Sequence, residues 1–153
     1  MDDQSRKLQF LRAGSLELGI FTDEIAAIAE WREPTPLPHA PKSVLGVVSI
    51  QGRMLTVIDL AVLSNIETGP EDGSDVLPRH IISLRGDEQL ALAVAAIGET
   101  SLVSESDLSQ PMATEERFVL SVLRHGDVEV KVLNVKELFP VALQGRERRQ
   151  RQF

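Results

Sequence analysis

Short runs rich in valine, isoleucine and leucine recur along the chain, and each is bounded by glycine, proline or charged residues. Such runs outnumber patterns with a helical period, and their composition is typical of β-strands. We therefore predict an all-β fold with short helices. Strands are expected over Lys7–Arg12, Leu16–Phe21, Leu45–Ile50, Met54–Asp59, His80–Leu84 and Leu90–Ala95.

The stretch from Pro36 to Leu60 organises the rest of the chain. Pro36, Pro38 and Pro41 each fix their own φ and push the preceding residue toward extended backbone, so this part is expected to be a rigid surface connector. The two apolar runs that follow are separated by Gln51-Gly52-Arg53, where glycine can supply a positive φ. This pattern predicts a buried β-hairpin.

The predicted hairpin occurs twice. One offset aligns Leu45-Gly46-Val47-Val48 with Leu120-Ser121-Val122-Leu123, and the same offset aligns Leu55 with Val130. Two copies of one unit suggest two small barrels, which close their sheet edges, although the strands alone are equally compatible with a single sandwich. We expect a domain over 7–140, with lobes at about 7–66 and 79–140 separated by the loop-like segment Glu67–Pro78.

Alternation in the second copy predicts which side chains of the first copy are exposed. Val128, Val130 and Val132 alternate with Glu129 and Lys131, as in a half-exposed strand. Transferred to the first copy, this phase points two side chains inward and three outward, so an exposed apolar patch is expected. The inward residues are Leu55 and Val57, and the outward residues are Met54, Thr56 and Ile58.

Two places favour short helices. Thr22-Asp23-Glu24 offers an N-cap with acidic residues in the first turn. We expect one helical turn here, with Ile25 and Ile28 on one face, which relaxes into a strand near Trp31; Ala96–Ser104 mirrors this region in the second half.

The second helical place follows a strand in each half. Asp59 directly follows the strand of the first copy and is interpreted as the N-cap of a short helix starting at Leu60. Asn134 occupies the equivalent position in the second copy and is expected to cap in the same way.

Composition narrows the class of protein. A chain of 153 residues buries about two thirds of its unfolded surface and needs no metal or disulfide to fold. It has no cysteine, which fits a reducing compartment, and it has no signal sequence or apolar run of about 20 residues, so we expect a cytoplasmic protein without membrane insertion. The net charge of −7 argues against nucleic acid as a partner.

Candidate chemistry is sparse. His39, His80 and His125 lie in a proline loop, at a strand start and in a hairpin turn, with no two at metal-ligand spacing. The usual nucleotide-binding, zinc-protease and nucleophile-elbow motifs are absent from the sequence. We therefore predict no enzyme activity, no cofactor, no metal and no catalytic residue.

A longer motif runs through the organising stretch, and its residues are Leu37-Pro38, Pro41, Leu45-Gly46-Val47, Ser49-Ile50-Gln51-Gly52 and Ile58-Asp59-Leu60. These residues resemble the CheW-type coupling domain of bacterial chemosensory arrays, and the resemblance runs from about Leu8 to Phe139. The sequence departs from the family pattern at Gln51, where the family has arginine, and at Thr56, where the family usually has proline.

This resemblance implies two intertwined five-stranded SH3-like β-barrels and a non-enzymatic adaptor. Such an adaptor couples the cytoplasmic tip of methyl-accepting chemoreceptors to the regulatory domain of a CheA-type histidine kinase, in the cytoplasm beside membrane-bound receptor arrays. The partner-binding residues it implies are Ile25, Ala27, Ile28, Leu45, Gly46, Ser49, Gln51, Gly52, Arg53, Met54 and Ile58.

Several alternatives stay open at this stage. The chain could be a divergent paralogue that binds the kinase in a specialised system or acts as a decoy, or, less in keeping with its charge, a small-barrel nucleic-acid module. Ile25 fits core or groove, Trp31 fits a buried anchor or an interface hot spot, and Arg53 is a substitute for the missing arginine if the turn is not bulged. The basic tail over 141–153 fits a flexible solubilising end or a tether to an acidic partner or anionic lipid.

Overall fold

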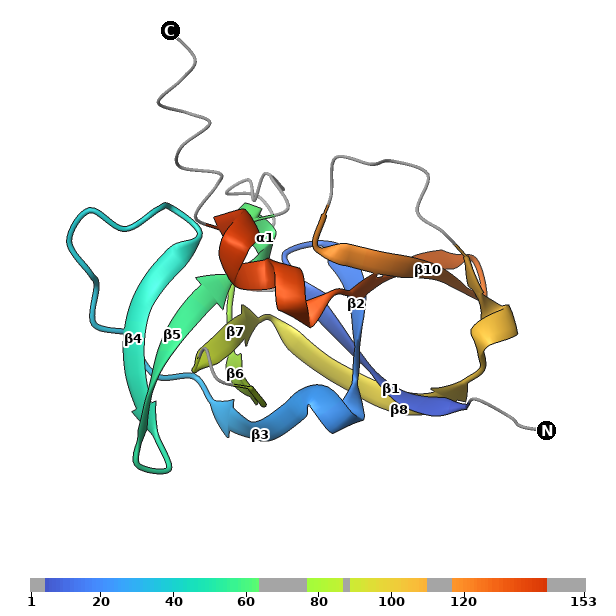
Figure 1. Cartoon of the computed structure of the whole chain (residues 1–153), viewed down its shortest axis with the longest axis horizontal. Helices are drawn as coiled ribbons and strands as arrows, with labels where there is room; N and C mark the ends of the chain where they lie inside the picture. Colours follow the sequence, from blue (N-terminus) through green and yellow to red (C-terminus); the bar gives the residue numbers. More distant parts are fainter. Residues whose placement is uncertain (1–4, 64–76, 87–88, 110–116, 143–153) are drawn as a thin grey trace, which may run out of the picture.

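Two strongly curled β-sheets make up the molecule, together with a few short helices (Figure 1). The structure is a computed structural model, and it describes residues 5–63, 77–86, 89–109 and 117–142. The predicted loop Glu67–Pro78 lies almost wholly outside the described residues, and so does the basic tail from residue 143 onward. The all-β prediction with short helices is confirmed.

The first sheet has six strands in the order β8-β1-β2-β11-β10-β9, and the second has five in the order β3-β6-β7-β5-β4. Strand bounds agree with the expected runs to within one residue at most ends, because the apolar runs end at glycine and charged residues. The strands are β1 (Arg6–Ala13), β2 (Leu16–Phe21), β3 (Ile25–Glu30), β4 (Val44–Ile50), β5 (Arg53–Asp59), β6 (His80–Leu84), β7 (Leu90–Val94), β8 (Ala96–Val103), β9 (Leu108–Ser109), β10 (Val119–His125) and β11 (Val128–Leu133).

The two halves of the chain exchange strands. β8 comes from the second half but pairs with β1, and β3 comes from the first half but pairs with β6. The hairpin of each half also joins the sheet of the other half, because β11 pairs in parallel with β2 and β5 pairs in parallel with β7. The sequence halves at 7–66 and 79–140 therefore do not form one sheet each, and the two barrels are intertwined.

The predicted repeat is visible in the hairpins. The antiparallel pair β4–β5 has a register shift between Val44 and Gly46, and the pair β10–β11 has one at the aligned positions Val119 and Ser121. A bulge at the same place in both copies bends each strand in the same way.

Three apolar clusters fill the molecule. One lies inside each barrel, and the largest lies between the barrels and includes Leu18, Ile58 and Leu92. Leu55 and Val57 point into the second barrel as expected, at 1% and 0% exposed. The expectation of an exposed Ile58 is wrong: the side chain leaves the barrel interior as predicted, but the central cluster covers it completely.

The region after β2 is less helical than expected. A single 3-10 turn, η1 (Thr22–Glu24), keeps the acidic first turn but has Phe21 at the N-cap and no side-chain cap. Ile25 and Ile28 then lie in β3, where alternation puts Ile25 inward and Ile28 outward, so they do not share a face. The mirrored segment Ala96–Ser104 is likewise almost entirely strand, because both segments pair with an edge of the other half.

Three of the remaining helical segments pack on the central cluster: α1 (Leu60–Leu63), the 3-10 turn η4 (Val135–Glu137) and a helical segment over residues 138–142. The 3-10 turn η3 (Glu105–Asp107) follows β8 on the first barrel. Val141 packs on the central cluster and Ala142 is 1% exposed, so these two residues, which lie beyond the expected boundary at 140, are part of the packed structure. Figure 1 shows this last segment beside α1.

Candidate partner-binding surface

The connector between β3 and β4 closes the second barrel. The Thr35 N–H donates to the Val47 carbonyl at 2.8 Å, and the Val47 N–H donates back to the Thr35 carbonyl at 2.9 Å. One guanidinium nitrogen of Arg32, Nη1, donates to the Ser49 carbonyl at 2.6 Å. The outer edge of β4 is thereby joined to the end of β3, and the outside of the barrel becomes continuous from β3 to the β4–β5 hairpin.

Gly46 makes this closure possible. Its φ is +144°, and a Cβ at this position would lie 2.1 Å from the Thr35 carbonyl oxygen. Gly46 is also buried. The aliphatic-glycine step of the motif therefore has an architectural reason, since it lets the connector cross the strand, and Gly46 cannot itself offer a side chain to a partner.

The tip of the β4–β5 hairpin is exposed at every position that the sequence selected. Gln51 and Gly52 form the turn with φ of +52° and +78°, as a two-residue type I′ turn requires. Arg53 belongs to β5 and pairs with Ile50, so the turn has two residues and not the three that the sequence suggested. The exposed group, which we call the hairpin tip, is Ser49, Gln51, Gly52, Arg53 and Met54.

Strand phase divides the hairpin tip into two directions. Ser49 and Met54 are paired across the strands and lie on the outer face, with Met54 58% exposed. Arg53 pairs with Ile50, which is 4% exposed and points into the barrel, so Arg53 belongs to the inner face beyond the end of the core. Arg53 is therefore directed away from the outer face.

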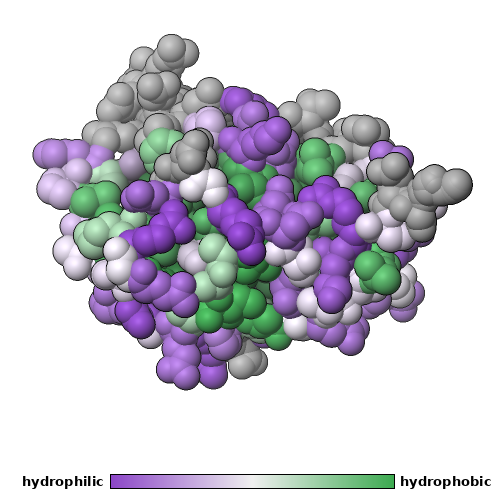
Figure 2. Space-filling model, turned by 60° about the horizontal axis from the view of Figure 1, so that its bottom comes forward, coloured by the Kyte–Doolittle hydropathy of each residue, from purple (hydrophilic) through white to green (hydrophobic). Residues whose placement is uncertain are grey.

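β3 supplies the other predicted residues. Its burial alternates along the strand, and Ile28 is 46% exposed on the outer face. Ala27 is half-buried, and its carbonyl accepts a hydrogen bond of 3.4 Å from the Ser83 hydroxyl. Figure 2 turns the β3 side of the molecule forward and shows hydrophobic residues gathered in the middle of that face, between hydrophilic ones.

Other predicted residues are partly or wholly withdrawn into the cores. Ile25 is half-buried against the central cluster, and Leu45 packs on the core of the second barrel. Trp31 also packs on that core, and its backbone N–H donates to the Arg79 carbonyl at 3.0 Å, which makes it an anchor for the connector. Together with the buried Ile58, these residues support the surface from behind.

The side chains of Asp59 and Asn134 differ in helix capping. The Asp59 carboxylate accepts hydrogen bonds from the N–H groups of Ala61 at 3.0 Å and Val62 at 3.4 Å, which confirms the predicted cap of α1. Burial raises the Asp59 pKa above its ordinary value, against the lowering effect of these two hydrogen bonds. Asn134 makes no side-chain cap, so the expectation of an equivalent cap in the second copy is wrong.

Glu24 is a second carboxyl affected by burial. Its Oε1 atom is buried with no hydrogen-bond partner, and burial raises its pKa while the nearby charges of Arg6 and Lys136 oppose the shift. Glu24 lies in η1, and among the described residues it belongs to no group of three or more His, Asp or Glu side chains that could hold a metal ion.

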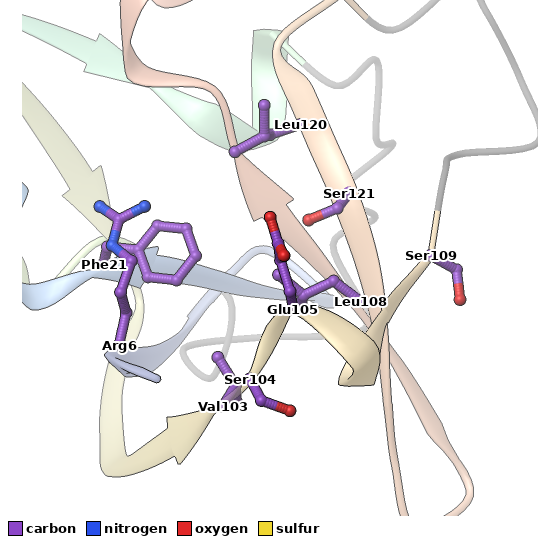
Figure 3. Close-up of a pocket in the computed structure, with 9 residues that line it drawn as sticks. All are labelled: Arg6, Phe21, Val103, Ser104, Glu105, Leu108, Ser109, Leu120 and Ser121. Carbon is purple, nitrogen blue, oxygen red and sulfur yellow. The ribbon is translucent and has the colours of Figure 1, made fainter. Parts of the chain in front are cut away.

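A hollow of about 370 Å³ opens on the first barrel, away from the hairpin tip. Figure 3 shows Leu120 and Ser121 of β10 on one side of it, with Arg6 and Phe21 on the other. The Arg6 guanidinium is already engaged, since it lies 3.7 Å from the Phe21 ring centre and bonds the Asp23 carboxylate at 2.9 Å.

Within residues 5–63, 77–86, 89–109 and 117–142, no group of three or more His, Asp or Glu side chains could hold a metal ion. In the same residues, no helix is long and apolar enough to cross a membrane.

Comparison with known proteins decides the family. The model of the CheW-like domain matches residues 7–142, which is nearly the whole chain. The chain belongs to the CheW-like domain family. The Chemotaxis protein CheW of Rhizobium meliloti (strain 1021) is 26% identical over 142 residues, covering 88% of each chain. The Probable chemotaxis protein CheW of Rhizobium etli is 24% identical over 146 residues, covering 91% of this chain and 90% of the relative.

A solved structure confirms the fold. The crystal structure of the scaffolding protein TtCheW from Thermoanaerobacter tengcongensis matches with a TM-score of 0.73 at 20% identity, over 84% of this chain and 88% of that one. The CheW-like double barrel predicted from the motif is therefore present.

One departure from the CheW-like pattern has a structural explanation. The Thr56 N–H donates to the Gln89 carbonyl at 2.9 Å, at the start of the β5–β7 pairing, and proline at this position would lack that donor. Sequence reasoning missed Arg32, whose bond to Ser49 joins β3 to the hairpin. The one signal for it was a cation placed directly after the lone tryptophan and before the proline-rich connector.

Proposed function

We propose that this CheW-like chain is a non-enzymatic adaptor that couples chemoreceptors to a CheA-type histidine kinase. The observation that carries the proposal is the outer surface of the second barrel, on which the large apolar side chains of Ile28 and Met54 are exposed. Exposed apolar side chains on a rigid frame favour a protein partner. We call the outer residues of β3 and the hairpin tip, joined by Arg32, the docking surface.

The receptor partner is a helical hairpin tip, whose apolar stripe would lie over Ile28 and Met54 beside the turn at Gln51. A different barrel surface would pair with the homologous barrel of the kinase regulatory domain. The adaptor itself breaks no bond: holding both partners in one geometry lets a receptor shift change kinase activity through a coupling free energy. The proposed location is the cytoplasm, beside membrane-bound receptor arrays.

Complex formation tests this proposal. Purified chain would be mixed with a cognate receptor fragment that contains the cytoplasmic helical tip and with the kinase regulatory domain, alone and together, and analysed by size-exclusion chromatography with light scattering. A complex with all three components is expected. Binding to neither partner would refute the adaptor function.

A second candidate is favoured by Gln51. An amide replaces the charged clamp that the family places in this turn, so the chain can instead be a divergent paralogue that binds the kinase and not receptors. In the same chromatography it would form a complex with the kinase domain alone. Retention on DNA that falls with salt would point to the remaining nucleic-acid alternative.

A further inference from the structure

The turn of the docking surface lacks the arginine that the family pattern has there. Gln51 carries no charge, and Arg53 lies on the inner face of its strand. Where the end of β3 meets the outer edge of β4, the described cation bonded to the hairpin is Arg32, whose side chain donates to the Ser49 carbonyl.

Arg32 is held in a fixed direction from both ends. Its backbone follows Trp31, which packs on the barrel core and bonds the Arg79 carbonyl. Its side-chain end is held 2.6 Å from Ser49, the residue paired with the exposed Met54. Such anchoring lowers the conformational entropy that a long side chain loses when it binds a partner.

The charge of Arg32 is still available. A guanidinium has five N–H donors in a planar fork, and the structure uses one of them here. Glu30 and Glu33 are its near neighbours in the sequence, yet among the described residues no carboxylate lies within ion-pair distance of Arg32. The side chain is exposed on the outside of the barrel.

We infer that Arg32 is the carboxylate-binding residue of the docking surface, and that it takes the place left by the uncharged Gln51. This inference rests on the proposed function. Its occupant is an aspartate or glutamate on the receptor's helical tip, next to the apolar stripe that covers Met54. A planar fork beside an apolar side chain matches an amphipathic helix with a carboxylate at the border of its apolar face.

A purely structural role for Arg32 predicts something different. β4 is an edge strand of its sheet, and exposed edges invite pairing with another chain. If Arg32 merely covers this edge, its removal would promote self-association and leave receptor binding unchanged.

The test uses the full chain and a soluble receptor fragment containing the helical tip, with affinity measured by calorimetry at low and high salt. Arg32→Gln should weaken binding by about 10- to 100-fold and flatten its salt dependence, because a hydrogen-bonded charge pair is lost. Arg124→Gln removes an exposed cation from β10, outside the docking surface; it is the matched control and should change affinity by less than about 2-fold. Gln51→Arg added to Arg32→Gln should restore most of the affinity.

Each outcome decides between these readings. If the wild type binds and Arg32→Gln binds equally tightly with the same salt dependence, the inference is overturned while the adaptor function stands. Self-association of Arg32→Gln with unchanged receptor affinity also overturns it, in favour of edge protection. If the wild type does not bind the receptor fragment, the receptor half of the proposed function and the inference fall together.

A receptor-side series keeps the test decisive if Arg32→Gln does not fold. Acidic residues of the receptor tip would be changed singly to their amides and measured against the wild-type chain. One substitution should reproduce the loss and the reduced salt dependence. If none of the substitutions does so, the inference is overturned.

Discussion

The hairpins β4–β5 and β10–β11 are copies of one unit, yet different kinds of segment cover the outer edges of β4 and β10. On β4, the connector bonds Val47 and the Arg32 side chain bonds Ser49, so a long segment covers the edge. On β10, a two-residue strand covers two positions, with Leu108 opposite Leu123 and Ser109 opposite Val122. Two copies of a unit can therefore keep the same core and present different surfaces, because different segments of the chain pair with their outer edges.

The aligned positions Gly46 and Ser121 show this difference within one residue. Gly46 has to lack a side chain because the Thr35 carbonyl crosses directly over it. Ser121 sits at the matching bulge, and its hydroxyl is buried without a hydrogen-bond partner, beside the hollow of Figure 3. The space over Gly46 is therefore filled by the connector, whereas the hollow lies beside Ser121.

The largest effect is expected from a substitution that disrupts the covered edge of β4. Gly46→Ala should destabilise the protein by about 3–5 kcal/mol, because its Cβ meets backbone at a φ that side chains rarely adopt. Ser121→Ala is the matched change and should be neutral or stabilising by up to about 1 kcal/mol, since it removes an unpartnered buried hydroxyl. Urea unfolding of both variants measures this, and equal losses would contradict the comparison.

The second-largest effect is expected on the outer faces of the two hairpins. Met54 aligns with Glu129, and both are exposed at the start of the second strand of their hairpin. Met54→Glu should leave stability within about 0.5 kcal/mol of the wild type, because it is a surface change. Receptor affinity should fall by about 10-fold or more if Met54 anchors the apolar stripe. Unchanged affinity would remove Met54 from the docking surface.

The two strand ends give a smaller contrast. Asp59→Ala should cost about 1 kcal/mol, because the cap of α1 loses its two backbone hydrogen bonds. Asn134→Ala should cost close to nothing, because Asn134 makes no side-chain cap. Thermal melts of the two variants test the asymmetry, and a larger loss at Asn134 would reverse it.

The smallest effect is a pH dependence. Because burial raises the Asp59 pKa, protonation of this group favours the folded state: its stabilising effect is full below the ordinary Asp value of 3.8 and is lost as the pH rises through the raised folded value. Asp59→Asn keeps an acceptor but cannot titrate. The stability of the wild type relative to this variant should therefore fall from acid to neutral pH. Denaturant unfolding at both pH values checks the sign, and a relative rise would contradict it.

Local features were readable from the sequence where local rules decide them. The apolar runs, the repeat and a glycine-containing turn after Ile50 each follow from composition and spacing, and the structure agrees with them except that Arg53 belongs to β5. The burial of Ile58 was not readable, since the strand phase was right and the covering cluster comes from the other half of the chain. The strand exchange between β3 and β8 was likewise set by long-range pairing.

The candidate site divides in the same way. The exposed tip and Met54 followed from the hairpin pattern, and the family motif supplied the rest of the residues. Arg32 could not be selected, because its importance depends on a bond to Ser49 that forms when the barrel closes. Gly46 was selected for contact, but its role is to let the Thr35 carbonyl pass.

Kinase coupling is the most direct test of the adaptor account. Receptor-containing membranes and the full-length kinase would be combined with and without this chain, and the rate of kinase autophosphorylation would be measured before and after receptor ligand is added. The account predicts a ligand-dependent rate that requires the chain and is lost with Met54→Glu. A ligand response of the same size without the chain, or none in its presence, would contradict it.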